Sequence, residues 1–204
     1  MATMIGDPIN LTTEYGVFKA YHVKSASESD NKLMEGVALS SLRTKVGTTP
    51  ILVRVQSSCV FSESFHSHDC DCALQLSTAA KLISLGEGLI IYQYDEGRGM
   101  GLESKFKAIR LQQLHGIDSK AACRALSIDV DSRSYAGVAD VVGFLAGDRP
   151  IVLLSNNPAK ERSLREQGLR IFARHRLLCT TNNPLIVEYL NEKRRTFGHD
   201  IPDL

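Results

Sequence analysis

The chain has 204 residues, of which 43% are hydrophobic and 23% are charged, and its formal net charge is +1. This length suits one large domain or two small ones, with enough apolar residues for a proper core. A net charge this close to zero argues against a protein whose main partner is nucleic acid or an anionic membrane. It is compatible with a local basic pocket for phosphate.

The N-terminus, MATMIGDPIN, has neither the basic nor the apolar region of a signal peptide. No apolar run approaches the length needed to cross a bilayer. We therefore expect a cytoplasmic protein, in which clustered cysteines more often bind metal or take part in chemistry than form disulfides. The five cysteines are an odd number, and Cys123 and Cys179 lie far from the other three, which argues against a disulfide scaffold.

The first half of the chain predicts four strands and two helices. The strands are expected at 14–23, 36–42, 50–58 and 88–94, with a polar hairpin loop at 25–32. Helices are expected at 73–86 and 105–116, and each ends at a glycine, a common helix terminator.

The second half alternates helices and strands. Helices are expected at 134–147, 159–168 and 183–198, and strands at 150–155 and 169–178. This alternation predicts an α/β fold (mixed α+β) in which helices layer against a sheet. The chain shows no internal repeat or linker, so we expect a single domain over residues 1–204.

Three cysteines lie in the stretch CVFSESFHSHDCDC, with ten residues between Cys59 and Cys70 and one between Cys70 and Cys72. Zinc takes four ligands in structural sites, and three ligands plus water in catalytic ones. Three cysteines would leave one position open, whereas His66 or His68 could close a structural site. We expect both histidines to be exposed in a loop. Catalytic zinc, structural zinc and ordinary buried cysteines remain three alternatives on spacing alone.

A glycine-rich turn, YDEGRGMG, follows the strand expected at 88–94 and carries Glu96 and Arg98. Glycines let the backbone approach a ligand closely. A glutamate can accept from the paired N–H groups of guanine, and an arginine matches phosphate bidentately. The alternative is a routine turn with a surface ion pair.

Two further segments suit anion binding. Asp131 and Arg133 are two residues apart, so both side chains would point to the same face if the segment is extended. The segment from Ser155 to Lys160 joins a strand to a helix, where the helix N-terminus favours an anion. Each segment alone would equally suit an ordinary loop.

In this order, the segments resemble the GTP cyclohydrolase II family, the zinc enzymes that open riboflavin biosynthesis. The opening TEYGVF and the closing EYL…K…GH also look like the ends of that family, so the resemblance spans nearly the whole chain. The matching motifs are a cysteine, ten residues, C-D-C and a glutamine (Cys59, Cys70, Cys72, Gln75), E-G-R (Glu96, Gly97, Arg98), D-x-R (Asp131, Arg133), T-N-N-P-x-K (Ser155, Asn156, Asn157, Pro158, Lys160), and a threonine that corresponds to Ser119.

The resemblance implies GTP as the substrate and a zinc ion held by the three thiolates, with water as the fourth ligand. Hydroxide would attack carbon 8 of guanine, the imidazole ring would open, and a second attack would release formate. Magnesium is expected with the triphosphate, and a homodimer is the expected assembly.

The resemblance also implies roles for single residues. Glu96 is expected to hold the nucleotide, and Arg98 and Lys160 to meet the triphosphate. Asp131 corresponds to a proton acceptor and Arg133 to a nucleophile in pyrophosphate release. A guanidinium is essentially always protonated, so we expect Arg133 to stabilise the phosphates electrostatically instead. The residues assigned to substrate binding are Arg54, Gln75, Glu96, Gly97, Arg98, Ser119, Ser155 and Lys160.

The chain departs from the family at two positions. Ser58 replaces a glutamate, and Ile109 stands where the family has a catalytic tyrosine. Isoleucine can neither donate a proton nor orient a water, and losing such a group commonly costs on the order of a hundredfold or more at the step it serves. A local shift of the helix register, or Tyr92 or Tyr94, would restore a phenol.

Three functions are therefore compatible with the sequence. The first is a full GTP cyclohydrolase II, and the second is a relative that stops at the formamidopyrimidine nucleotide. The third is a nucleotide- or zinc-binding protein without turnover. We expect a GTP-hydrolysing zinc enzyme, and the sequence leaves its product open.

Overall fold

The structure is a computed structural model that describes residues 3–26, 32–43, 47–178 and 181–202. Cys179 and most of the loop expected at 25–32 lie outside the described residues. Within these ranges, eight strands form one mixed sheet. The strands are β1 (Met4–Ile5), β2 (Ile9–Thr13), β3 (Gly16–Ala26), β4 (Leu33–Ser40), β5 (Ile51–Ser57), β6 (Gly88–Gln93), β7 (Ile151–Leu154) and β8 (Ile171–His175).

The sheet is antiparallel in one half and parallel in the other. Its order is β1-β3-β4-β6-β5-β7-β8, with β2 paired to β3 off this path. Strands β1 to β4 and β6 pair antiparallel, whereas β6, β5, β7 and β8 pair parallel. The helices are α1 (Val60–Glu63), α2 (Cys72–Leu85), α3 (Gly101–His115), α4 (Ser119–Ala125), α5 (Ala136–Ala146), α6 (Pro158–Glu166) and α7 (Pro184–Phe197), with a 3₁₀ turn, η1 (Glu96–Gly99).

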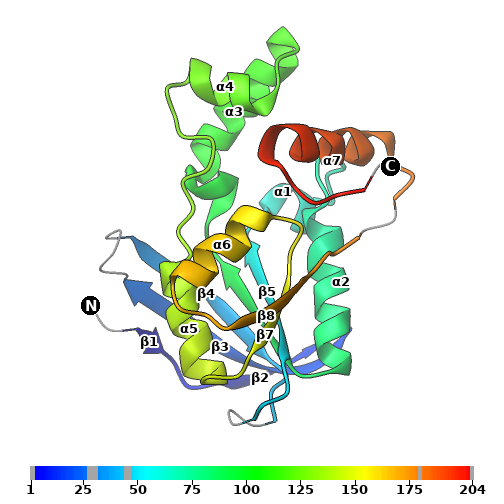
Figure 1. Cartoon of the computed structure of the whole chain (residues 1–204). Helices are drawn as coiled ribbons and strands as arrows, with labels where there is room; N and C mark the ends of the chain where they lie inside the picture. Colours follow the sequence, from blue (N-terminus) through cyan, green and yellow to red (C-terminus); the bar gives the residue numbers. More distant parts are fainter. Residues whose placement is uncertain (1–2, 27–31, 44–46, 179–180, 203–204) are drawn as a thin grey trace.

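Helices cover both faces of the sheet (Figure 1). Because successive strand residues point to opposite faces, β6 supplies Leu89 and Ile91 to one core and Ile90 to the other. Residues of α5 and α6 pack in the first core, and residues of α2 in the second. The predicted α/β layering is confirmed.

Every helix and strand expected from the sequence is present, with bounds that differ by a few residues. Elements β1, β2, α1, α4 and the first turn of α3 were not predicted from the sequence. Elements β1 and α1 are too short to show a periodic pattern, and β2 is mostly exposed, so it lacks the alternation of a half-buried strand. The predicted helix starts at residue 105 and the observed α3 at Gly101, because the glycines in this stretch indicated a longer turn.

The parallel strands bring distant loops to one edge of the sheet. Cys59, Glu96 and Ser155 follow β5, β6 and β7, and the carboxyl ends of parallel strands lie together. The chain leaves β5 towards α2 on one face and leaves β7 towards α6 on the other. Ligands of open α/β sheets bind in the crevice that such a divergence creates.

None of the helices in the described part of the chain combines the length and the apolar character needed to span a membrane.

Two glycine substitutions test the packing of the sheet. A Cβ at Gly36 in β4 would overlap the carbonyl oxygen of Tyr92 on β6, so Gly36→Ala is expected to lower the free energy of unfolding by about 1–3 kcal/mol. Gly143 in α5 is exposed, and a Cβ there has no neighbour within 4 Å. Gly143→Ala is therefore expected to raise the free energy of unfolding by about 0.5–1 kcal/mol. Urea unfolding followed by circular dichroism measures both, and equal effects would contradict the close approach of β4 and β6.

Candidate functional site

A cavity of about 500 Å³ lies at the carboxyl edge of the parallel strands. It draws its walls from loops after β5, β6 and β7 and from helices α2, α3, α4, α6 and α7. Every residue that the sequence analysis assigned to the site lines it: Arg54, Cys59, Cys70, Cys72, Gln75, Glu96, Gly97, Arg98, Ser119, Asp131, Arg133, Ser155 and Lys160.

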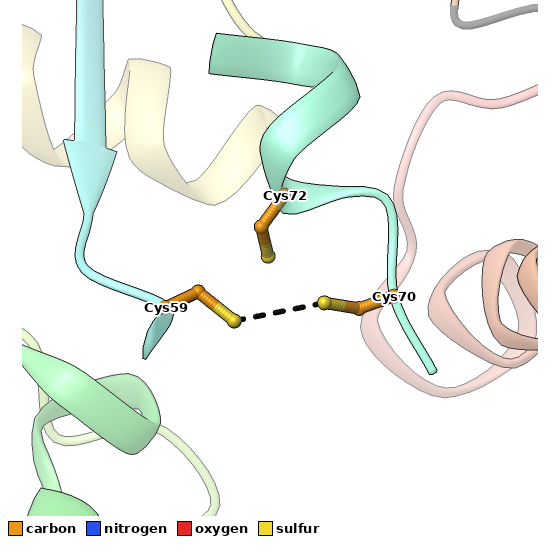
Figure 2. A group of neighbouring side chains, drawn as sticks. All are labelled: Cys59, Cys70 and Cys72. Carbon is orange, nitrogen blue, oxygen red and sulfur yellow. Dashed lines mark hydrogen bonds between the residues drawn. The ribbon is translucent and has the colours of Figure 1, made fainter. Parts of the chain in front are cut away.

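Three cysteines form a compact group in the wall of the cavity, called here the thiol cluster (Cys59, Cys70 and Cys72). Figure 2 shows their sulfurs pointing towards one another, from the segment after β5, the following loop and the first residue of α2. The Sγ atoms of Cys59 and Cys70 are 3.6 Å apart, and all three sulfurs lie within 4.8 Å of one another. His66 and His68 are exposed, as expected, and neither belongs to this group.

The thiol cluster fits a zinc ion. Zn–S bonds of about 2.3 Å at tetrahedral angles place sulfurs about 3.8 Å apart, close to the spacing found here. In the described part of the chain, no histidine or carboxylate joins the three sulfurs in a potential metal group. A fourth coordination position would therefore face the cavity, which is the arrangement of catalytic rather than structural zinc.

The pKa values of the three thiols are shifted in different directions. Hydrogen bonds from the Cys70 and Cys72 thiols lower the pKa of Cys59 to about 2. The same contact with Cys59 raises the pKa of Cys70, and contacts with Cys59 and Cys70 raise the pKa of Cys72 well above its usual value. The cluster as a whole thus gives up one proton readily and holds the others more strongly, because negative charges this close together repel one another.

Glu63, one turn after Cys59, fixes the backbone of the thiol cluster. Its carboxylate accepts hydrogen bonds from the Cys59 amide (3.1 Å), the Tyr92 hydroxyl (2.5 Å) and the Gln56 side chain (2.7 Å). Glu63 was not predicted as a site residue from the sequence. The sequence signal that could have identified Glu63 is its position four residues after Cys59, about one helical turn away.

Lys105 joins the thiol cluster to Glu96. The Lys105 ammonium lies 3.4 Å from the Cys59 sulfur and 2.6 Å from Glu96 Oε1, and Glu96 Oε2 accepts from the Val60 amide at 2.8 Å. Burial lowers the pKa of Lys105, but Glu96 and Cys59 outweigh it, so the pKa is raised and the ammonium stays charged. Lys105 lies one helical turn before Ile109, and both side chains line the cavity.

A buried polar network lies beneath the cavity. The Arg54 guanidinium donates to the Gln56 side chain (2.6 Å and 3.0 Å), the Gln75 side chain (2.8 Å) and the Leu154 carbonyl (3.0 Å). Gln75 in turn donates to Asp71. Both predicted substrate residues, Arg54 and Gln75, therefore have most of their hydrogen-bonding groups engaged inside the protein.

Cations also line the cavity, and we name Arg54, Arg133 and Lys160 its basic group. Lys160 is 5% exposed and donates to the Val55 carbonyl at 2.8 Å. Burial, reinforced by the charges of Arg54 and Arg133, lowers the pKa of Lys160 well below its usual value. Such a group gains stability when an anion enters.

Asp131 and Arg133 form a bidentate ion pair on the irregular segment before α5. The Arg133 Nε lies 2.8 Å from Asp131 Oδ1, and Nη2 lies 2.5 Å from Oδ2. Burial lowers the pKa of Arg133, but the hydrogen bonds and charge of Asp131 outweigh it, so the pKa is raised. For Asp131, burial raises the pKa and Arg133 outweighs it, so the pKa is lowered. The segment is not a strand, yet the two side chains meet.

The loop after β6 bends sharply to present Arg98. Gly97 and Arg98 both have left-handed backbone angles (φ 63° and 58°), a region in which arginine is uncommon. The Arg98 guanidinium stacks 4.0 Å above the Phe197 ring. Ser119 is also engaged, because its amide and hydroxyl both donate to Glu192 Oε1 (3.0 Å and 2.5 Å).

Helix α7 and the segment after it supply several of the cavity residues that were not predicted from the sequence. Five of them line the cavity: Tyr189, Glu192, Lys193, Phe197 and His199. The motif EYL…K…GH was noticed in the sequence as an end of the chain, and it carries three of these five residues.

Known proteins resemble the chain over most of its length. The sequence profile of the GTP cyclohydrolase II family matches residues 6–176. A "GTP cyclohydrolase-2" of Haemophilus influenzae (strain PittGG) is 36% identical over 193 residues, which cover 94% of this chain and 86% of that protein. The "GTP cyclohydrolase-2" of Histophilus somni (strain 2336) is 36% identical over 94% of this chain and 85% of that protein. The "Riboflavin biosynthesis protein RibBA" of Endomicrobium trichonymphae is 37% identical over 94% of this chain and 46% of its own length.

His199 makes the stability of the fold depend on pH. Burial, followed by the charges of Lys193 and Arg133, lowers the pKa of His199 to about 3. Its Nδ1 is buried without a hydrogen-bond partner among the described residues. Below the unfolded-state pKa of about 6.5 the unfolded chain binds a proton that the folded chain does not, so the free energy of unfolding falls as the pH falls, by about 1 kcal/mol between pH 7.5 and 5.5.

His199→Gln is expected to remove this share of the pH dependence. Urea unfolding of metal-free, reduced protein at pH 7.5 and 5.5 measures it, with His115→Gln, an exposed position at the end of α3, as the matched control. The same pH difference in the wild type and in H199Q would show that His199 has no part in it.

Proposed function

The chain belongs to the GTP cyclohydrolase II family, and from this membership we propose that it is a zinc-dependent hydrolase that opens the imidazole ring of GTP at carbon 8. The products would be formate, pyrophosphate and a diaminopyrimidine ribosyl phosphate, on the pathway to riboflavin. The observation that carries the proposal is a single cavity lined by both a three-thiol cluster and a group of cations. We further propose that residues 1–204 act as one domain.

Cys59, Cys70 and Cys72 would hold the zinc ion. Zinc in such a site supplies a nucleophile near neutral pH, because it lowers the pKa of a water to about 7. Lys105 supports the cluster by donating to the Cys59 sulfur, which offsets part of the thiolate charge. Glu96 lies beside Lys105, and its carboxylate oxygens have lone pairs left for the N–H donors of guanine. The reacting carbon would then lie between Glu96 and the thiol cluster.

The triphosphate would contact the basic group. Lys160 is charged most easily when an anion lies beside it, and the N-terminus of α6, capped by Asn157, adds a favourable dipole. Arg98 stacks on Phe197 and leaves the edges of its guanidinium for phosphate oxygens. Gly97, Ser119 and Ser155 line the same cavity. Magnesium would accompany the phosphates.

Arg133 and Asp131 would serve the triphosphate as a pair. The raised pKa of Arg133 keeps its guanidinium charged, so it would stabilise phosphate oxygens rather than attack phosphorus. Asp131 accepts two hydrogen bonds from the Arg133 guanidinium, and the Asp131 side chain is still 37% exposed. Asp131 can therefore orient Arg133 and accept a proton from solvent, but its lowered pKa makes it a weak base.

A second candidate is a hydrolase that stops at the formamidopyrimidine nucleotide. Helix α3 runs unbroken from Gly101 to His115, and Ile109 lines the cavity, which argues against a shifted register. The Tyr92 hydroxyl donates to Glu63, and Tyr94 is 58% exposed; neither tyrosine lines the cavity. Among the described residues, Tyr189 on α7 is the tyrosine that does line it. The product depends on whether Tyr189 can serve in place of a tyrosine at position 109.

The homodimer and the cytoplasmic location stay predictions. Helices α3 and α4 project from the body of the molecule (Figure 1). On α3, Leu102, Phe106 and Leu114 are 43%, 57% and 64% exposed, an apolar surface that supports assembly of two copies.

Zinc removal tests the central proposal. Zinc-loaded protein with magnesium is expected to convert GTP to pyrophosphate and a ring-opened product, measured by mass spectrometry with formate and pyrophosphate assays. Chelation of the metal, or Cys70→Ser, is expected to lower the rate by about a hundredfold or more, because the zinc-activated nucleophile is lost. Cys123→Ala, buried in the same cavity but outside the thiol cluster, is the control and should keep its metal. Turnover that survives both chelation and C70S would contradict zinc dependence.

Ile109→Tyr tests which product forms. If the wild type releases a formylated pyrimidine, I109Y is expected to raise formate release per GTP consumed by about a hundredfold, since a phenol can donate the proton that isoleucine cannot. If the wild type already releases formate, Tyr189→Phe is expected to suppress formate release more than ring opening. A formylated product that I109Y leaves unchanged would separate residue 109 from deformylation.

A further inference from the structure

Helix α7 is tied to three separate walls of the cavity, although it lies beyond the matched residues 6–176. Glu192 accepts two hydrogen bonds from Ser119 at the start of α4, and the Phe197 ring stacks against the Arg98 guanidinium. Lys193 forms an ion pair with Asp71, with 2.7 Å between Nζ and Oδ1. Figure 1 shows α7 at the end of the sheet that also holds α1 and the start of α2.

The partner of Lys193 is the middle residue of the C-D-C motif. Asp71 lies between Cys70 and Cys72, and its side chain is 1% exposed. One carboxylate oxygen accepts from Lys193, and the other accepts from Gln75, whose side chain is held by Arg54. Asp71 is thus fixed from both sides, and its neighbours in the chain are two members of the thiol cluster.

The ammonium of Lys193 is directed at this segment and not at solvent. Its side chain is 11% exposed and lies 4.5 Å from the centre of the Tyr189 ring. Removing one member of a buried ion pair leaves the other charge without compensation, which strongly disfavours the arrangement that buries it. Without Lys193, the Asp71 carboxylate would therefore tend to turn outward, and the backbone that carries Cys70 and Cys72 would turn with it.

We propose that Lys193 is a positioning residue of the metal site: through Asp71, it holds Cys70 and Cys72 in the arrangement in which their sulfurs face Cys59. The inference rests on the zinc site of the proposed function. Contacts to groups that orient metal ligands typically contribute 10- to 100-fold in metal affinity. Lys193 acts at a distance, since it contacts the aspartate between the ligands and none of the ligands themselves.

The test is a metal titration of the full chain. Reduced, metal-free protein is titrated with Co²⁺ against a chromophoric chelator, and the thiolate-to-cobalt absorbance reports ligation by sulfur. Lys193→Met is expected to weaken Co²⁺ binding by about 10- to 100-fold. Lys193→Arg keeps the charge and is expected to recover part of the affinity. Arg195→Met makes the same change in charge at an exposed position of α7 that does not line the cavity, and it should match the wild type.

A double variant guards against a folding defect. K193M with Asp71→Asn removes both charges of the pair, so no unpaired carboxylate remains to turn outward. It is expected to bind Co²⁺ more tightly than K193M alone and less tightly than the wild type, because the link to α7 is still missing. Wild-type Co²⁺ affinity in K193M overturns the proposal, as does a double variant that binds Co²⁺ no more tightly than K193M, because Lys193 would then not act through Asp71. A K193M that loses only GTP affinity also overturns it and would make Lys193 a nucleotide ligand. A wild-type protein without thiolate-to-cobalt absorbance would instead overturn the zinc site on which the inference rests.

Discussion

Three cysteine sulfurs held within 4.8 Å of one another cannot all carry negative charge unless cations lie close by. The protein places cations on two sides of them. Lys105 on α3 donates directly to the Cys59 sulfur, and Lys193 on α7 pairs with Asp71 between the other two cysteines. Helices that are far apart in the chain therefore meet around the thiol cluster, α3 through a direct contact with a sulfur and α7 through Asp71.

The sheet separates two kinds of chemistry within one cavity. The segment after β5 carries the thiol cluster, whereas the segment after β7 leads into α6 with Lys160 and a favourable helix dipole. A nucleotide is itself divided in this way, with a neutral base at one end and a strongly anionic triphosphate at the other. The turn after β6, with Glu96 and Arg98, lies in the wall of the same cavity and carries one residue suited to each end.

Much of the site could be predicted from the sequence, because its residues lie in short segments with recognisable spacing. The cysteines, the E-G-R turn and the segment from Ser155 to Lys160 each follow a strand that its apolar pattern predicts. The role of α7 could not be predicted in this way, since Asp71 and Lys193 are 122 residues apart and no local pattern links them. The internal hydrogen bonds of Arg54 and Gln75 likewise depend on packing that spacing does not reveal.

The separation of Asp71 and Lys193 also has a consequence in time. Ribosomes add about 5–20 residues per second, so a nascent chain carries the complete C-D-C motif for roughly 6–24 s before Lys193 is synthesised. During that interval the Asp71 carboxylate lacks its ammonium partner, and the cysteines are held only by the earlier part of the chain. The newly made thiols are then most open to oxidation, and a reducing environment protects them until α7 packs against the cavity.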